Sequence, residues 1–372
     1  MAETRIEWAD RTWNPITGCT KISEACQHCY AERMSKRLAG RCGYPKDDPF
    51  QVVKHDDVFA HPLKWRKPSR VFVCSMGDLF HKDVLDDWIL AAFVSMGLTY
   101  QHTGKMREIE PGYEVAIHAP KHTFMILTKR PERMKNFIER LRSDETDKEW
   151  EVRVRHYAYT LSAMNGDILP GNAVFTFYEW LNDGMPGLWL GVTAENQQRA
   201  DERIPILLQT PAAKRFVSVE PMLGQVDLTP YLGDLYFCNH HGRLCPEGVI
   251  YAADYKTVLC KYCKQPVQIT TPLNLVICGG ETGPGARPMH PDWVRSLRDQ
   301  CQAAGTPFFL KSWGDWAPGT LFEPCPRGSC KIINLDGGEL TPNSLLMRKV
   351  GKKAAGRLLD GREWNEWPEV EA

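Results

Sequence analysis

The chain has no net charge, since its 46 lysines and arginines are balanced by 46 aspartates and glutamates among 372 residues. Balanced charge produces no overall field that attracts nucleic acid, a membrane surface or acidic ligands, so any such partner must be bound by a local patch. The sequence also lacks an apolar run of about 18 residues and a basic segment followed by an apolar one at its start. These absences predict a cytoplasmic protein that does not bind a membrane.

Cysteine, by contrast, is abundant, with thirteen residues in the chain. Because a reducing compartment disfavours disulfides, metal ligation is the better expectation for these thiols. Hydrophobic residues make up 43% and charged residues 25% of the chain, as in ordinary globular proteins. The length accommodates two average domains, or one α/β barrel-like domain with insertions.

Three of the cysteines, Cys19, Cys26 and Cys29, form a C-x6-C-x2-C loop that leads into an amphipathic segment, Ala31 to Leu38. A [4Fe-4S] cluster normally takes four cysteines, so three would leave one iron open to a substrate or cofactor. The same spacing also suits a zinc knuckle with His28 as the fourth ligand, or three unrelated thiols. The sequence favours the cluster.

Short apolar runs rich in β-branched and aromatic residues recur along the chain, and most are followed by a helical pattern. This repetition predicts βα units around a parallel sheet of six or seven strands. The expected strands are Trp13 to Thr17, Val71 to Ser75, Thr123 to Thr128, Leu188 to Thr193, Arg215 to Val219, Leu273 to Cys278 and Pro307 to Leu310. Two stretches interrupt the pattern and are expected to be insertions, from about residue 101 to 120 and from about residue 142 to 186.

Chemically unusual residues follow the carboxyl ends of these strands, where ligands bind in barrels and in open α/β sheets. They are Ser75-Met76-Gly77-Asp78, Thr128-Lys129-Arg130-Pro131, Thr193-Ala194-Glu195-Asn196, Glu220-Pro221, Gly279-Gly280-Glu281-Thr282 and Lys311-Ser312-Trp313. One edge of the sheet is therefore the expected active face.

A second cysteine set lies between the expected strands that end at Val219 and begin at Leu273, and it comprises Cys238, Cys245, Cys260 and Cys263. The spacing of Cys260 and Cys263 is that of a zinc knuckle, and its pairing with an earlier set predicts a structural zinc ribbon. His241 with Cys245 is an alternative half-site, and an auxiliary iron-sulfur cluster or no metal are the other interpretations. Cys325 and Cys330 form a looser pair, of either ligands or exposed loop thiols.

Seven separate blocks of the sequence resemble a phage-associated three-cysteine family of unknown function, common in phages and prophages. The blocks extend from about residue 5 to 368: IEWADRTWNPITGCTKISEACQHCYAERM, VFVCSMGDLF, FMILTKRPERM, LWLGVTAENQ, RFVSVEPMLG, VICGGETGPGARPMHPDWVRSLRDQ and GRLLDGREWNEWP. That family is similar to radical S-adenosylmethionine (SAM) enzymes, whose partial barrel of about six βα units carries a three-cysteine loop after its first strand. The first cysteine gap of those enzymes is usually three residues, whereas here it is six.

The resemblance implies an α/β fold of the radical SAM type, a partial TIM-like barrel with six or seven βα units. Residues 1–320 would form the barrel, residues 234–270 a zinc-ribbon-like insertion, and residues 321–372 a C-terminal extension. Cys19, Cys26 and Cys29 would hold the [4Fe-4S] cluster, and SAM would bind its open iron. An electron from a donor such as flavodoxin or ferredoxin would then cleave SAM to a 5'-deoxyadenosyl radical.

The resemblance also implies where SAM binds. Ser75, Met76, Gly77 and Asp78 match in position the turn that holds the methionyl amino group, with Asp78 as the acceptor. Glu195 and Asn196 suit the ribose hydroxyls, and Gly279, Gly280 and Glu281 are expected on the substrate or ribose side. The structural alternatives are a helix cap at Asp78, a surface or capping acid at Glu195, and a tight turn at the two glycines.

Basic residues and tryptophans suggest nucleic acid or a nucleotide as the substrate, although such residues also form solvated faces and cores. They are Arg33, Lys36, Arg37, Lys129, Arg130, Arg133, Arg348, Lys349, Lys352, Lys353, Arg357, Trp313, Trp316, Trp364 and Trp367. Two other functions remain open. One is a non-catalytic zinc or iron-sulfur module that binds nucleic acid. The other is a hydrolase or nuclease that holds a divalent metal with Asp78, Glu195, Glu220 and Glu281.

Overall fold

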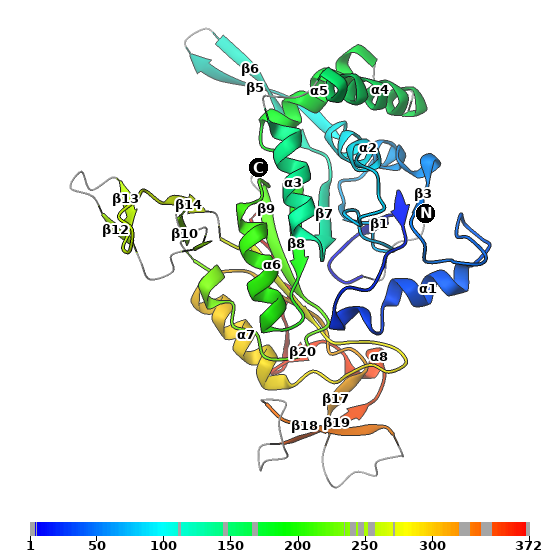
Figure 1. The fold of residues 1–372 in the computed structure, drawn as a ribbon, viewed down its shortest axis with the longest axis vertical. Coiled ribbons are helices and arrows are strands. Elements are labelled where there is room, and N and C mark those ends of the chain that lie inside the picture. The colour runs from blue at the N-terminus through cyan, green and yellow to red at the C-terminus, as the bar shows by residue number, and fades with distance from the viewer. Residues whose placement is uncertain are drawn as a thin grey trace. The chain divides into compact units, whose positions relative to one another are not determined.

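A computed structural model of the chain has a mixed α/β fold (Figure 1). It describes residues 4, 6–110, 113–143, 148–165, 170–233, 235–238, 243–244, 249–251, 257–270, 272–319, 328–335 and 344–369. The chain divides into two compact units. Unit 1 comprises Met1–Ile22, Cys29–Gly191 and Thr210–Lys214, and unit 2 comprises Ser23–His28, Val192–Gln209 and Arg215–Ala372.

Seven strands are hydrogen-bonded in the order β1-β4-β7-β8-β9-β15-β16. The order of these strands in the sheet is therefore the same as their order in the chain. They are β1 (Arg11–Trp13), β4 (Arg70–Val73), β7 (Thr123–Thr128), β8 (Leu188–Thr193), β9 (Lys214–Val219), β15 (Leu275–Gly279) and β16 (Phe308–Ser312). Strands β1, β4 and β7 pair in parallel in unit 1, and β9, β15 and β16 pair in parallel in unit 2. The boundary between the units falls within β8, after Gly191. Parallel strands added in chain order have the connectivity of a β/α barrel. The predicted α/β class and strand number are confirmed.

The strands form where apolar, β-branched residues are continuous, because a parallel sheet covered on both faces buries every side chain. All six residues of β8 and all five of β15 are buried. The predicted bounds of the first strand are wrong. Strand β1 ends at Trp13, and β2 (Ile16–Thr17) pairs instead with β3 (Val53–Lys54). Pro15 explains the break, since it has no N–H to continue the ladder.

Helices follow the strands, as the βα pattern predicts. They are α1 (Tyr30–Leu38) after the cysteine loop, α2 (Asp86–Gly97) after β4, α3 (Pro131–Arg142) after β7, α6 (Gln197–Gln209) after β8 and α7 (Pro291–Ala303) after β15. Among the helices of the described residues, none is long and apolar enough to cross a membrane.

The second insertion covers α2. Its helices, α4 (Lys148–Asn165) and α5 (Pro170–Asn182), pack on each other and on α2. Helix α2 is buried continuously from Ile89 to Gly97. A Cβ atom on Gly97 would lie 2.8 Å from a ring carbon of Phe177, so α5 approaches closely there. A helix that is apolar all round needs cover on each side, and the insertion supplies it. The first insertion is a hairpin of β5 (Tyr100–Glu110) and β6 (Tyr113–Pro120), visible as a two-stranded ribbon in Figure 1.

Unit 2 also contains the cysteine-rich insert and the C-terminal residues. The insert has strands β10 (Leu235–Cys238), β11 (Arg243–Leu244), β12 (Val249–Tyr251), β13 (Val258–Cys260) and β14 (Gln268–Thr270). The C-terminal elements are β17 (Trp316–Pro318), β18 (Cys330–Ile333), β19 (Leu345–Lys349), α8 (Lys352–Ala355), β20 (Leu358–Leu359) and β21 (Arg362–Glu363). Asn365 forms a bridge with Phe309 of β16, so the end of the chain packs on an edge strand.

Candidate functional site

Two glycines in unit 1 bring the start of the cysteine loop against the turn after β4. The Gly18 N–H donates to the Met76 carbonyl at 3.0 Å, and Gly18 and Gly77 form a parallel bridge. A Cβ atom on Gly18 would lie 2.0 Å from the Gln51 carbonyl oxygen, and one on Gly77 would lie 2.8 Å from that of Gly18. Gly18 also has a φ of +90°, which favours glycine. Cys19 is thereby held beside the carboxyl ends of β1 and β4.

Asn14 joins the same two strand ends. Its Oδ1 accepts from the Ser75 hydroxyl at 3.1 Å and from the Met76 N–H at 3.0 Å. Ser75, Met76 and Gly77, predicted to contact a cofactor, therefore make contacts that fix the root of the cysteine loop. Sequence reasoning missed Asn14, whose only signal is its place just after β1.

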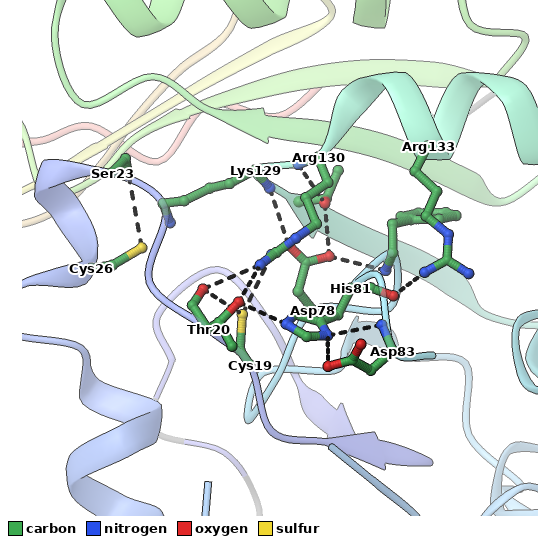
Figure 2. Close-up of polar contacts among 12 residues, drawn as sticks. Cys19, Thr20, Ser23, Cys26, Asp78, His81, Asp83, Lys129, Arg130 and Arg133 are labelled. Carbon is green, nitrogen blue, oxygen red and sulfur yellow. Dashed lines mark hydrogen bonds and ion pairs between the residues drawn. The ribbon is translucent and has the colours of Figure 1, made fainter. Parts of the chain in front are cut away.

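The carboxylate of Asp78 is buried and fully engaged within unit 1 (Figure 2). Its Oδ1 accepts from the Thr128 hydroxyl at 2.7 Å and from the Phe80 N–H at 3.0 Å. Its Oδ2 accepts from Arg130 Nη1 at 2.8 Å and from the Lys129 N–H at 3.3 Å. A carboxylate offers about four acceptor positions, and all four are used by the protein itself.

Arg130 connects Asp78 to the first cysteine. Its Nη1 lies 3.4 Å from the Cys19 sulfur, and its Nη2 donates to the Thr20 carbonyl at 3.1 Å (Figure 2). Burial lowers the pKa of Arg130, but the charges of Asp78 and Cys19 outweigh it and raise that pKa above its usual value. A fixed positive charge therefore lies against the Cys19 sulfur.

His81 supports Thr20 from the other side. The Asp83 N–H donates to Nδ1 of His81 at 3.2 Å, so Nε2 carries the proton and donates to the Thr20 hydroxyl at 2.8 Å. Burial, and then the charge of Arg130, lower the pKa of His81, which keeps the ring neutral. Arg133 donates to the carbonyls of His81 and Val84. Arg130 and Arg133, expected to contact phosphate, are thus engaged inside the protein.

The cysteine loop belongs to both units, with Cys19 and Cys29 in unit 1 and Cys26 in unit 2. None of the three is in a disulfide, and all three are partly exposed. Their convergence on one cluster remains a prediction.

Within unit 2, Arg287 holds the middle of this loop. Its Nη2 donates to the Glu24 carbonyl at 3.0 Å, and its Nη1 donates to Gln27 Oε1 at 3.3 Å. Glu281 binds the same guanidinium at 2.7 and 2.9 Å through both carboxylate oxygens. Arg199 pairs with the Glu24 carboxylate at 3.1 Å. The two arginines were not identified from the sequence.

Of Gly279 and Gly280, both expected near the substrate or ribose, Gly280 permits a close backbone contact, whereas a Cβ atom on Gly279 would lie 3.3 Å from the Glu220 side chain. A Cβ atom on Gly280 would lie 2.2 Å from the Trp313 carbonyl oxygen, and the Gly280 N–H donates to the Ser312 carbonyl at 2.9 Å. The backbones of the turns after β15 and β16 can therefore lie in contact only if residue 280 is glycine.

Glu195 is completely buried after β8 and is only half satisfied. Its Oε2 pairs with Arg203 Nη1 at 2.9 Å, whereas its Oε1 has no hydrogen-bond partner among the described residues. The Ser218 hydroxyl of β9 is likewise buried without a partner in the described part of the chain. Asn196 caps α6, since its Oδ1 accepts from the Arg199 N–H at 3.0 Å.

Each of the four carboxylates expected to bind a divalent metal has a basic partner of its own. The pairs are Asp78 with Arg130, Glu195 with Arg203, Glu220 with Lys311, and Glu281 with Arg287. A carboxylate that is already neutralised by an arginine or lysine is a poor ligand for a divalent cation.

The second cysteine set is partly assembled. The sulfurs of Cys238, Cys260 and Cys263 all lie within 4.8 Å of one another, whereas Cys245, His241 and Cys325 lie outside the described residues.

Other cysteines belong to the core. Burial raises the pKa of Cys74 and of Cys301 to about 12, which keeps both as inert thiols.

Three of the four tryptophans expected to stack on bases are core residues instead, and the fourth, Trp367, is half-buried with its ring 5.4 Å from that of Phe309. Trp313, Trp316 and Trp364 are all buried. The indole N–H groups of Trp313 and Trp316 each donate to a backbone carbonyl at 2.8 Å, from Leu358 and Ala286 respectively. These rings fill the space under the C-terminal elements, so they are not available for stacking on a base.

Comparison with known proteins gives one family match. A family model described as "Protein of unknown function (DUF5131)" matches residues 3–108 and 105–368. No curated protein and no solved structure matches the chain.

Proposed function

The chain belongs to the DUF5131 family of proteins of unknown function, and we propose that it is an iron-sulfur enzyme of the radical SAM type. Its cofactors would be a [4Fe-4S] cluster and SAM, and its fold would be the partial barrel of those enzymes. The substrate would be nucleic acid or a nucleotide, in line with the resemblance to phage-associated proteins. The family model matches most of the chain, but the description of the family names no activity.

One observation supports this function most strongly. The first cysteine of the loop lies where three parallel strands end, beside a guanidinium held by a buried carboxylate. Hydrogen bonds and positive charge at the ligating sulfur are the means by which proteins stabilise thiolates and tune iron-sulfur clusters. A structural thiol has no need of such a partner.

The donor set fits a cluster with one open iron. Three partly exposed cysteines, none of them in a disulfide, occur within one loop, and the arrangement of Gly18 and Gly77 fixes the first of them. A bound cluster would supply the electron that cleaves the sulfonium bond of SAM, which yields the 5'-deoxyadenosyl radical. The protein's part is to fix the sulfurs, hold charge beside them and orient SAM.

Glu195 is the residue best suited to orient SAM. Buried polar atoms are nearly always hydrogen-bonded, so the unpartnered Oε1 calls for a donor that the described residues do not supply. A ribose hydroxyl is such a donor, and Ser218 would offer a second polar atom from the neighbouring strand. Asp78, by contrast, is already saturated, so we assign it the positioning of Arg130 rather than direct contact with the methionyl ammonium.

The metal-dependent hydrolase is less well supported. It requires several carboxylates that converge on one cation, whereas Asp78, Glu195, Glu220 and Glu281 each pair with a basic side chain. The non-catalytic binding module gives no reason for a buried, half-satisfied Glu195.

The test is spectroscopic and uses the anaerobically reconstituted, reduced protein. Addition of SAM should change the electron paramagnetic resonance spectrum of the cluster, because a new ligand binds the open iron. Arg130→Met should lower the midpoint potential, since the guanidinium favours the more negative, reduced state. The control is Arg140→Met in α3, the helix that begins directly after Arg130, where the Arg140 side chain is exposed and pairs with Asp86. A spectrum that SAM leaves unchanged would exclude SAM as the ligand, and an unaltered potential in Arg130→Met would exclude the role of Arg130.

A further inference from the structure

The cysteine-rich insert between β9 and β15 has a core made largely of thiols. Among its described residues, the buried cluster consists of Cys238 and Cys260, with Cys263 and Val267 packed against it. The insert spans residues 235–270, which is below the length of about 40 residues at which chains usually need a metal or disulfides to fold. Four side chains of this size bury too little apolar surface to order five strands.

The backbone of the insert brings the three cysteines together from separate strands. Cys260 ends β13, and a tight turn follows, in which the Lys264 N–H donates to the Cys260 carbonyl at 2.8 Å. Strand β14 begins after this turn and pairs with β10, with Phe237 opposite Gln268. Cys238, the next residue of β10, is thereby placed beside the knuckle.

The distances between the sulfurs suit one metal ion. Cys238 and Cys263 have their sulfurs 3.5 Å apart, and all three sulfurs lie within 4.8 Å of one another. In a tetrahedral site with zinc-sulfur bonds of about 2.3 Å, neighbouring sulfurs are about 3.8 Å apart. A disulfide of about 2.05 Å would join only two of them and leave the third thiol unmatched. An iron-sulfur cube places its thiolates on separate irons and so holds them farther apart.

We propose that Cys238, Cys260 and Cys263 bind one structural zinc ion, which orders the insert independently of the iron-sulfur chemistry. Three thiols lose their protons to the solvent and the thiolates bind Zn²⁺, with no change of oxidation state. Zinc is the metal of choice for closed thiolate sites without redox function. Cys245, predicted from the sequence as a fourth ligand, lies outside the described residues. The ion takes the place of the apolar core that the insert lacks among its described residues.

The experiment measures zinc by mass spectrometry in the full-length protein, purified without added metal. The wild type should contain about one zinc per chain, and Cys238→Ser, Cys260→Ser and Cys263→Ser should each retain less than about a tenth of it. Cys42→Ser is the control, because Cys42 is a free and exposed cysteine, and it should keep its zinc. Cys19→Ala should also keep it, which separates this site from the cluster.

A second measurement does not depend on whether the serine variants fold. Titration of the wild-type thiols with an organic mercurial should release the zinc, and limited proteolysis should then cut within the insert, residues 235–270, while the zinc-loaded protein resists. Wild-type protein without zinc, iron bound to these cysteines, or a Cys238–Cys263 disulfide found by peptide mapping would each overturn the assignment. So would full zinc retention in all three serine variants.

Discussion

Replacement of Cys19, Cys26 or Cys29 by alanine is expected to abolish the oxygen-sensitive iron of the anaerobically reconstituted protein. Each cysteine would supply one of only three protein ligands, so its loss leaves two irons of the cluster without a thiolate. Iron content should fall from about four atoms per chain to near zero, together with the brown colour. Iron and zinc are measured in the same samples, and the zinc should remain, because the two cysteine sets are separated by more than 200 residues of chain.

The control for this series is Cys42→Ala. Cys42 is exposed, lies shortly after α1 and belongs to neither cysteine set. Its variant should reconstitute with a normal iron content. If all three loop variants kept about four irons, the cluster assignment would be wrong.

The second large effect is on stability. Asp78→Ala should lower the free energy of unfolding by about 3 to 5 kcal/mol, because it leaves the largely buried Arg130 without its partner. It also removes the acceptor for the Thr128 hydroxyl, at 2.7 Å in the intact protein. Denaturant unfolding of the cluster-free protein measures this loss without interference from the cofactor.

Two further variants isolate the cause. Asp78→Ala combined with Arg130→Met should recover part of the loss, since no uncompensated charge remains buried. Asp56→Ala removes an exposed pair with Lys54 and should cost at most about 1 kcal/mol. A loss of less than about 1 kcal/mol in Asp78→Ala, together with weakened SAM binding, would contradict the positioning role and restore Asp78 as a direct ligand.

The strands were largely predictable because a buried parallel strand has a strong sequence signal. Strands β7 and β8 have the predicted bounds, Thr123–Thr128 and Leu188–Thr193. The first strand was predicted too far along the chain, as Trp13 to Thr17 and not as Arg11–Trp13, since apolar Ile16 follows Pro15 although the ladder of β1 ends at Trp13. The packing of α4 and α5 on α2 could not be predicted from the sequence. Hydrophobic periodicity identifies the buried face of a helix but does not say which other helix packs on it.

The residue types of the candidate site could be predicted from the sequence, but the pairs that their side chains form could not. Asp78 and Arg130 were both singled out, one for an ammonium and the other for phosphate, yet they pair with each other across 52 residues. Nothing in local sequence specifies such a pairing, which depends on β4 and β7 being neighbours. Arg287 and Asn14 were missed for the same reason, since their partners come from distant turns.

The formation of 5'-deoxyadenosine tests the proposed function most directly. Iron-replete protein, reduced with dithionite and mixed with SAM, should release 5'-deoxyadenosine slowly even without substrate, and Cys19→Ala protein should release none. Chromatography with mass detection measures the product against a sample without reductant. If the reduced, iron-replete protein releases no 5'-deoxyadenosine, with or without added nucleic acid or nucleotides, the chain is not a radical SAM enzyme.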